Sequence, residues 1–349
     1  MTDWTLEPLH AIDETAKAAA IQHQTQLTKP PGSLGVLESV AVRLQALKPH
    51  KTLINHCHIS IFAADHGIAA ENVSAFPQSV TAQMIQNFSN GGAAISVLAK
   101  HHQATFEIIN VGTVTDLPKM DAVIDARIAP GTENFMNACA MNKTQLAQAL
   151  AQGKEAAERA KNNTADVFIG GEMGIANTTS ATALACSLLQ EAPETLVGPG
   201  TGLNDTGIAH TAGVIRHAIQ HHQASLTCPL STLQCLGGFE IAALTGAYIR
   251  CGQLGLPILV DGFIATVAAF IAQKIQPDLQ HWFFFAHQSA EPGHARLMQA
   301  LHATPLLQLN MRLGEGSGAA IAFPLLQMAS LLHHQMATFA QAGVNNSSD

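Results

Sequence analysis

The chain has 349 residues, of which 47% are hydrophobic and only 12% are charged. Soluble domains usually carry about 25% charged residues, so much of this chain must be hidden in a large core or a subunit interface. The formal net charge is −8 with 17 Lys and Arg, and no basic run occurs, which argues against nucleic acid as a partner.

The apolar stretches are too short to cross a membrane. The longest, such as residues 263–272, fall below the ~18 residues that a spanning helix needs. The N-terminal residues MTDWTLEPLHAIDE are acidic and lack the basic start and apolar centre of a signal peptide. We therefore expect a protein of the cytoplasm without a membrane partner.

Helical and strand-like segments alternate along the chain. Residues 5–26 have helical spacing, the TKPPGSLG segment at 28–35 ends that helix, and residues 36–47 form the next one. Short segments rich in β-branched or aromatic residues predict strands at 58–65, 104–112, 165–172, 256–262 and 282–289. Further helical patterns lie at 77–88, 144–161 and 323–342.

This alternation predicts an α/β fold with a parallel, Rossmann-like sheet flanked by helices. In such sheets, ligands bind at the carboxyl ends of the strands, where Asp65, Glu172, Asp261 and Ser289 would gather. We expect a small helical domain built from both chain ends, residues 1–30 plus 320–349. Residues 31–319 would form the large α/β domain with the active site.

Cysteine and histidine positions indicate no metal site. The six cysteines form no CxxC pair, and we expect free, mostly buried thiols in a reducing compartment. Histidines cluster at 56–58, 101–102, 221–222 and 333–334, but no HExxH and no zinc-finger spacing occurs. We expect these clusters at the solvated surface.

The stretch ADVFIGGEMGIANTTSATALACSLL, residues 165–189, joins a buried strand to a helix through a glycine-rich turn. The helix start offers unpaired N–H groups. Hydrogen-bonding side chains follow at Asn177, Thr178, Thr179 and Ser180. The pattern suits a phosphate, although an ordinary capped helix has the same pattern. Glu172 in this turn suits a ligand with a positive or proton-releasing part.

Three other loops leave alternatives open. GPGTGLNDTG at 198–207 suits a phosphate or sugar, or is a flexible surface loop. Asp65 and His66 are catalytic, or they fix their loop by hydrogen bonds. AHQSAEPGH at 286–294 offers a serine and histidines, but the GxSxG elbow of hydrolases is missing.

Glu315 stands alone among glycines and apolar residues in MRLGEGSGAA, residues 311–320. Such a carboxylate is either a turn residue facing water or a base held where water is scarce. The sequence around it decides between these readings.

Eight stretches in order resemble one enzyme family: TKPPGSLG, ADHGIAAENVSAFPQSVTAQM, GEMGIANTTSA, GTGLND, GGFEIAALTGA, LVDGFIATVAA, SAEPGH and MRLGEGSGAA. The family is nicotinate-nucleotide–dimethylbenzimidazole phosphoribosyltransferase, of the cobalamin nucleotide-loop pathway, and the resemblance covers about residues 25–330. It implies transfer of the phosphoribosyl group of nicotinate mononucleotide to 5,6-dimethylbenzimidazole, giving α-ribazole 5′-phosphate and nicotinate. It also implies a homodimer and neither a metal nor an organic cofactor.

The resemblance implies that Glu315 is the catalytic base and Glu172 a second active-site carboxylate. The other substrate contacts that we expect are Gln78, Gln83, Gln86, Met173, Gly174, Ile175, Asn177, Thr178, Thr179, Ser180, Gly200, Thr201, Gly202, Asp261, Ser289, Leu313, Gly314, Gly316 and Gly318. The chemistry makes the same demand, because attack by an imidazole nitrogen leaves the ring cationic unless a base removes its N–H proton. An apolar pocket would raise the pKa of that base.

One position departs from the family pattern. The helix after GTGLxD usually carries a lysine suited to the phosphate, and here the matching residue is Thr211. Phosphate binding would then rest on residues 174–180, on the 200–202 loop, or on His210 or Arg216. This leaves two alternatives open: the same reaction with another benzimidazole, a purine or a phenol, or a non-catalytic paralogue that binds a nucleotide or base.

Overall fold

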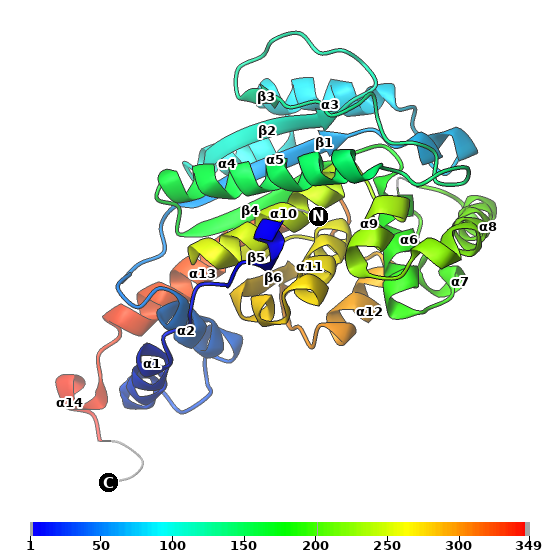
Figure 1. The fold of residues 1–349 in the computed structure, drawn as a ribbon. Helices are drawn as coiled ribbons and strands as arrows, with labels where there is room; N and C mark the ends of the chain where they lie inside the picture. The colour runs from blue at the N-terminus through cyan, green and yellow to red at the C-terminus, as the bar shows by residue number, and fades with distance from the viewer. Residues whose placement is uncertain (1–2, 201, 346–349) are drawn as a thin grey trace.

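The computed structural model describes residues 3–200 and 202–345 (Figure 1). Its sheet has the strand order β3-β2-β1-β4-β5-β6-β7, and every neighbouring pair is parallel. The strands are β1 (Cys57–Ala64), β2 (Thr105–Gly112), β3 (Val123–Asp125), β4 (Val167–Met173), β5 (Ile258–Val260), β6 (Phe283–His287) and β7 (Pro305–Leu307). The predicted α/β fold with a parallel sheet is confirmed.

The five predicted strands are the five inner ones, and the two edge strands β3 and β7 were not predicted. All eight residues of β1 are buried, because helices cover both faces of the sheet, and such strands read as continuous apolar runs. The edge strands have only three residues each and are partly exposed, so they carry no apolar run that a sequence pattern could reveal.

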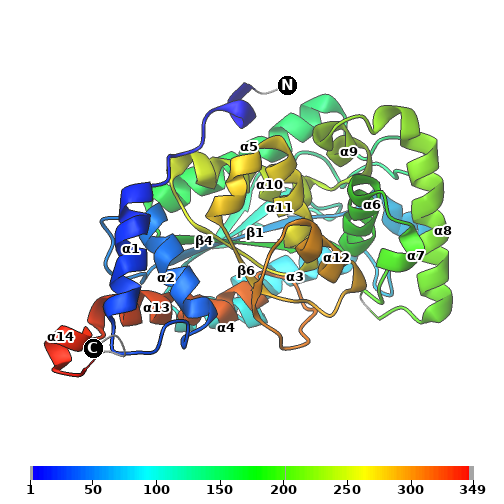
Figure 2. The ribbon, with the colours of Figure 1, turned by 90° about the horizontal axis from the view of Figure 1, so that it is seen from below.

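Helices pack on both faces of the sheet (Figure 2). One face carries α5 (Lys143–Asn162), α10 (Phe239–Leu254) and α11 (Phe263–Ile275), and the other carries α3 (Ser79–Ser89), α4 (Ala94–His101) and α13 (Ser317–Gln335). Beyond the carboxyl ends of the strands lie α6 (Asn177–Leu189), α7 (Pro193–Leu196), α8 (Asp205–His222), α9 (Pro229–Leu236) and α12 (Pro292–Ala300). None of the helices in the described ranges is long and apolar enough to span a membrane.

The closest helix packing is between α5 and α10, and it depends on two glycines. A Cβ added at Gly153 would meet the carbonyl oxygen of Ala243 at 1.8 Å, and one at Gly246 would meet that of Leu150 at 2.2 Å. Larger side chains would force the helices apart. This contact fixes α10 against β1 and β4, the strands that lead to the site described below.

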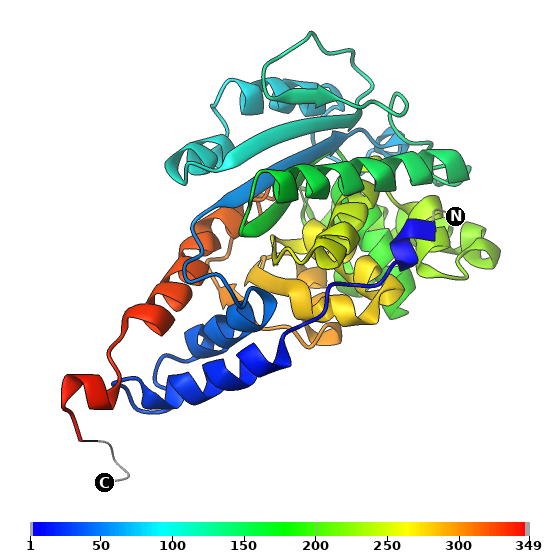
Figure 3. The ribbon, with the colours of Figure 1, turned by 60° about the vertical axis from the view of Figure 1, so that its left-hand side comes forward.

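Helices near the two ends of the chain lie together, on the side away from α6–α9, whereas the η1 turn (Asp3–Leu6) runs back to α10 (Figures 1 and 3). Here α1 (Glu14–Gln26) packs on α2 (Val36–Leu47), and α2 packs on α13. An isolated bridge pairs Leu27 with Thr338, just before α14 (Phe339–Ala342). Residues from both ends therefore share one helical layer.

Two predicted helix limits were wrong. The N-terminal helix begins at Glu14 rather than at residue 5, since Asp13 caps it by accepting the N–H of Ala16 at 2.8 Å. A short 3-10 turn, η1 (Asp3–Leu6), precedes it. The C-terminal pattern at 323–342 is broken where Met336 adopts an extended backbone and Thr338 caps α14. Local caps override the continuous apolar spacing at both ends.

Candidate active site

A cavity of about 290 Å³ opens at the carboxyl ends of β4, β5 and β6. Of the residues singled out from the sequence, its lining includes Glu172, Met173, Gly174, Ile175, Asn177, Thr178, Gly200, Asp261, Ser289, Leu313, Gly314 and Glu315. They come from segments that are far apart in the chain. The parallel sheet brings them together because all of its strands end at this edge.

Several other predicted contacts do not line this cavity. Gln78 donates from Nε2 to the carbonyl of His66 at 2.7 Å, and Gln83 and Gln86 lie on α3 outside the lining. Ser180 is fully buried, and Thr179 lines a separate small hollow next to Thr178. The positions of these side chains depend on tertiary contacts that their local motifs do not reveal.

Of the remaining predicted glycines, Gly316 and Gly318 allow close packing at the start of α13, and Gly202 lies elsewhere. A Cβ at Gly318 would meet Cδ2 of His287 at 2.1 Å, and one at Gly316 would meet Cα of Gly171 at 3.4 Å. These two positions let the loop lie directly on the sheet. Gly202 is exposed, and Thr201 lies outside the described residues.

Glu315 is held in a strained backbone at the start of α13. Its φ is +64°, between Gly314 at +80° and Gly316 at +76°, a left-handed region that residues other than glycine rarely adopt. A Cβ on Gly171 of β4 would lie 2.6 Å from the backbone carbon of Glu315, so only glycine lets the loop approach this closely. The chain therefore tolerates strain in order to place this side chain.

Glu315 is buried, with only 6% of its surface exposed to solvent. Burial, and secondarily the charge of Asp261, raise its pKa to about 7. A carboxylate with a pKa near neutrality can take a proton and release it again under ordinary conditions. Of the two readings left by the sequence, the water-facing turn residue is thus excluded.

Two further buried carboxylates line the same cavity. Glu172 accepts a hydrogen bond from the side-chain amide of Asn177, and burial raises its pKa well above the usual range, with Glu240 and Asp261 adding to the effect. Burial also raises the pKa of Asp261, an effect that His287, 3.8 Å away, opposes. Asp261 accepts the N–H of Gly316 and that of Ala319, so it caps α13.

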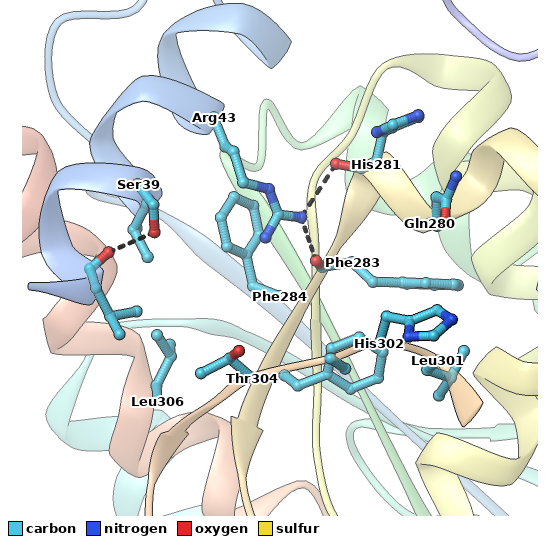
Figure 4. A pocket seen from close by; sticks show the side chains of 14 residues that line it. Ser39, Arg43, Gln280, His281, Phe283, Phe284, Leu301, His302, Thr304 and Leu306 are labelled. Carbon is cyan, nitrogen blue, oxygen red and sulfur yellow. Dashed lines mark hydrogen bonds between the residues drawn. The ribbon is translucent and has the colours of Figure 1, made fainter. Parts of the chain in front are cut away.

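A second hollow, of about 350 Å³, lies at the amino ends of the strands, between α2 and the starts of β6 and β7 (Figure 4). Arg43 is the only Lys or Arg among its described lining residues. Its guanidinium donates to the carbonyls of His281 and Phe283 and stacks 4.2 Å from the ring centre of Phe284. His281 and His302 line this hollow, but no carboxylate does within the described chain, in contrast to the first cavity.

Comparison with known proteins places this site in a family. The profile of a family described as "Phosphoribosyltransferase" matches residues 9–344. The chain belongs to this family. Nicotinate-nucleotide–dimethylbenzimidazole phosphoribosyltransferase of Pseudomonas fluorescens SBW25 is 53% identical over 346 residues, covering 99% of both chains. The same-named protein of Azotobacter vinelandii is 52% identical over 98% of both chains.

Solved structures agree with this assignment. The crystal structure of CobT from Thermus thermophilus superposes with a TM-score of 0.91 at 40% identity, covering 95% of this chain and 100% of that one. A second structure, of the nicotinate-nucleotide–dimethylbenzimidazole phosphoribosyltransferase of the same organism, superposes with the same TM-score of 0.91 at 39% identity. The resemblance drawn from the eight sequence stretches is therefore confirmed.

The residues expected to contact substrate did not include Phe76, Gly262, Phe263, Ile264 and Arg312, nor His287 and Glu291 of the AHQSAEPGH loop, all of which line the cavity of this phosphoribosyltransferase. Arg312 is the only Lys or Arg among them and donates to the carbonyl of Gly200 at 3.2 Å. A signal for Arg312 existed, because it lies in the same MRLGEGSG motif as Glu315. His287 carried a weaker signal, the end of a predicted strand.

Of the positions considered for the phosphate, Gly174, Asn177, Thr178 and Gly200 line the cavity, whereas Thr211, His210 and Arg216 lie outside it. Thr211 is 3% exposed and its Oγ1 has no hydrogen-bond partner among the described atoms. His210 bonds the carbonyl of Glu71 at 2.7 Å, and Arg216 pairs with Glu194. The cation available to a ligand in the cavity is Arg312 instead.

Asp65 and His66 fix their loop beneath the cavity of this phosphoribosyltransferase. Asp65 Oδ2 accepts the N–H of Val114 at 2.8 Å. His66 lies between Ser180 Oγ at 2.9 Å and Glu240 Oε1 at 2.7 Å, and all three side chains are fully buried. A buried Ser–His–Glu arrangement without access to the cavity cannot attack a substrate, so the loop-fixing alternative holds.

Two predictions about cysteine and histidine were wrong. Cys139 and Cys235 form a disulfide, and Cys228 is exposed, whereas Cys57, Cys186 and Cys251 are buried free thiols as predicted. The partners are 96 residues apart, so no spacing rule reveals them. In the histidine clusters, His58, His222 and His333 are buried, because adjacent residues point to opposite sides of an element.

Among the described residues, the one group of His, Cys, Asp or Glu close enough to hold a metal ion is Cys139, His222 and Cys235. None of the three lines the cavity that holds Glu315.

Proposed function

We propose that this phosphoribosyltransferase transfers the phosphoribosyl group of nicotinate mononucleotide to 5,6-dimethylbenzimidazole, with Glu315 as the general base. The products are α-ribazole 5′-phosphate and nicotinate. The names of the relatives at 50–53% identity support this choice of substrates. The observation that carries the role of Glu315 is a buried carboxylate with a pKa of about 7 in the cavity at the strand ends.

The reaction needs one proton acceptor and no oxidant or reductant. A ring nitrogen of the benzimidazole forms a bond to C1′ of the ribose while the bond from C1′ to the nicotinate nitrogen breaks. The nicotinate ring leaves with the bonding electron pair and becomes neutral at nitrogen. The second benzimidazole nitrogen gives its proton to Glu315, so that the new nucleotide does not carry a cationic ring.

The aromatic acceptor would bind against apolar side chains at the mouth of the cavity. Leu313 is 56% exposed and Phe76 is 51% exposed, and both line the cavity together with Met173 and Ile175. Ligand pockets are lined predominantly by apolar and aromatic side chains of this kind. Gly314 lines the cavity without a side chain, while Gly316 and Gly318 let the same segment pack on β4 and His287.

The polar contacts of the acceptor and ribose would come from two sources. Gln83 and Gln86 are exposed on α3 and are proposed to contact the acceptor from outside the cavity lining, whereas the amide of Gln78 is held by the carbonyl of His66. Glu172 supports the ribose or the base, because its raised pKa lets a protonated carboxyl donate a hydrogen bond.

The phosphate of nicotinate mononucleotide would bind between the start of α6 and Arg312. The first N–H groups of a helix attract anions, and α6 begins at Asn177 and Thr178 on the cavity wall. Arg312 supplies the positive charge that Thr211 does not. Gly174, Thr179, Gly200, Thr201, Gly202, Asp261 and Ser289 complete the proposed substrate contacts, whereas Ser180, buried against His66, supports the start of α6 from behind.

The test is turnover of nicotinate mononucleotide with 5,6-dimethylbenzimidazole, with products separated by chromatography. We expect nicotinate and α-ribazole 5′-phosphate in equal amounts. Parallel reactions with other benzimidazoles, adenine and phenol identify the preferred acceptor. Binding of nicotinate mononucleotide without nicotinate release in any of these reactions would support a non-catalytic paralogue and contradict the proposal.

We also propose a homodimer in the cytoplasm, with a small domain from residues 1–30 and 320–349 and a large domain from 31–319. The 12% charge content, low for a soluble chain, favours a covered interface. Light scattering at micromolar concentration should give twice the monomer mass, and a monomeric mass would contradict the dimer. Cell fractionation checks the compartment, and limited proteolysis at residues 27–35 and 310–320 checks the division.

A further inference from the structure

The disulfide between Cys139 and Cys235 joins two segments that backbone hydrogen bonds already hold together. Cys139 lies in the loop between β3 and α5, and Cys235 lies in α9. The N–H of Ala140 donates to the carbonyl of Cys235 at 3.0 Å, and that of Met141 donates to the carbonyl of Gln234 at 3.0 Å. These bonds do not involve sulfur, so the two thiols of the reduced protein stay adjacent. Adjacent thiols react with each other at a high effective concentration.

A histidine faces this sulfur pair. His222, at the end of α8, has Nε2 2.8 Å from the carbonyl oxygen of Phe135 and Nδ1 3.8 Å from Sγ of Cys139. A carbonyl only accepts, so Nε2 carries the proton and Nδ1 presents a lone pair to the sulfur. An imidazole in this position can accept the proton of the Cys139 thiol, and the thiolate is the reactive form.

The two sulfurs differ in access from solvent. Cys235 is 2% exposed, whereas Cys139 is half-buried. A reagent from solvent therefore reaches Cys139 first, and Cys235 is placed to complete the exchange. Cys57, Cys186 and Cys251 are buried and separate from this pair.

We propose that Cys139, Cys235 and His222 form a thiol–disulfide exchange site for small disulfides of the glutathione class. The Cys139 thiolate attacks the glutathione disulfide, forms a mixed disulfide and releases one glutathione thiolate. The Cys235 thiolate then attacks Cys139 sulfur and releases the second glutathione, so that two cysteines are oxidised and one glutathione disulfide is reduced. A dithiol reverses both steps. In a reducing compartment such disulfides are usually transient.

The site is connected to the loop beneath the catalytic cavity. The segment that carries Cys139 also bonds the turn after β1, where the N–H of Thr132 donates to the carbonyl of Asp65 at 3.0 Å. On the other side, the carbonyl of Gly237, two residues beyond Cys235, accepts the hydroxyl of Ser180 at 3.4 Å. The disulfide thus links the segment that bonds Asp65 to the segment that bonds Ser180, and these two residues adjoin His66 in the sequence and in space. Its formation should raise the thermal stability of the protein.

The experiment starts from the full-length Cys228→Ser protein, because Cys228 is exposed and lies outside the pair. The protein is equilibrated with mixtures of glutathione and glutathione disulfide, quenched in acid, denatured and alkylated. Five cysteines remain in this protein. We expect all five to be alkylated in the reduced form and only three in the oxidised form, because the disulfide protects two. Peptide mapping should locate the loss at Cys139 and Cys235, with a higher Tm for the oxidised form.

Three single variants in this background test the order of events. Cys235→Ser should trap one glutathione on Cys139, because the second attack is impossible. Cys139→Ser should bind none, since Cys235 is buried. His222→Gln should oxidise severalfold more slowly than the parent.

Five labels in every mixture, or glutathione trapped on Cys235 instead, would overturn the proposal. So would a reduced protein that retains one equivalent of zinc and resists oxidation, since the three side chains would then be a metal site. If the His222→Gln protein oxidises at the parent rate, His222 has no part in the exchange and the proposed site of three residues is wrong.

Discussion

The carboxylate of Asp261 accepts the backbone N–H of Gly316 at 3.1 Å, one residue after Glu315. Its other oxygen accepts the N–H of Ala319 at 2.8 Å, which anchors the first turn of α13. One side chain at the end of β5 thus fixes the strained loop that presents Glu315, and its charge also contributes to the raised pKa of that residue. Asp261 therefore contributes both to the position of the proposed base and to its proton affinity.

Replacing Glu315 by Gln keeps the shape of the side chain but removes its ability to take a proton. If Glu315 is the general base, kcat should fall by about 10²–10⁴, the usual contribution of such a group. Binding of the acceptor should change less, because the amide oxygen still accepts a hydrogen bond. Steady-state turnover with both substrates saturating measures this. Glu172→Gln is the comparison and should cost less; a Glu315→Gln enzyme that keeps more than about a tenth of kcat rules out the assignment.

The activity should depend on pH through the same carboxylate. The base works when it is ionised, so kcat should rise with pH through about 7, the pKa of Glu315, and fall at lower pH. An unperturbed glutamate would give this limb near ~4.3. The pH profile of kcat measures the midpoint, and the limb should be absent from the residual activity of Glu315→Gln. A limb that persists unchanged in the variant would assign it to another group.

Glu315 should also lower the stability of the folded protein at alkaline pH. Its pKa is about 7 when folded and near 4.5 in the unfolded chain, so the folded state binds more protons between these values and stability falls as pH rises. Glu315→Gln lacks this term and should have a higher Tm than the wild type at about pH 8, with a smaller difference at about pH 5. Thermal unfolding at both values measures it. Glu14→Gln, at an exposed residue of α1, is the matched control and should give the same small difference at both pH values.

Replacing Asp261 by Asn separates its two contributions. The amide has one oxygen in place of two, so one of the two backbone N–H groups of the α13 start loses its acceptor. Loss of part of a helix cap should lower the free energy of unfolding by about 1 kcal/mol, and Tm should fall accordingly. The lost negative charge should lower the pKa of Glu315 and move the acid limb of kcat to lower pH. Both are measured on the same preparation. An acid limb that stays in place would show that Asp261 acts on Glu315 through position alone.

Arg312→Gln tests the proposed phosphate contact. A charge that binds the phosphate equally before and during reaction affects KM rather than kcat. We expect the KM for nicotinate mononucleotide to rise about 5- to 100-fold, while the KM for the acceptor and kcat change little. Arg296→Gln is the control, since Arg296 is exposed on α12 and pairs with Glu191 outside the cavity. Equal KM values for the two variants would contradict the role of Arg312.

Much of the fold and part of the site could be predicted from sequence because the signals are local. The continuous apolar runs at 58–65 and 165–172 reveal buried parallel strands, and the polar residues that close such runs must meet at one sheet edge. Glu172, Asp261 and Ser289 line one cavity for this reason, whereas Asp65, at the end of β1, does not line it. The glycines around Glu315 likewise carry their own signal, since a left-handed backbone that lies directly on a strand excludes larger side chains.

Other features depend on contacts between distant segments, and no local pattern determines such contacts. Gln78 had the same local context as a binding residue, but its amide is used by the carbonyl of His66. Arg312 reaches the cavity only because its loop returns beside Gly200, and Cys139 meets Cys235 only because the loop before α5 lies along α9. The sequence by itself determined the five inner strands, the strand ends at which ligands bind and the family. The tertiary structure alone decided which side chains face the cavity and the pKa of Glu315, since burial and the charge of Asp261 act through space rather than along the chain.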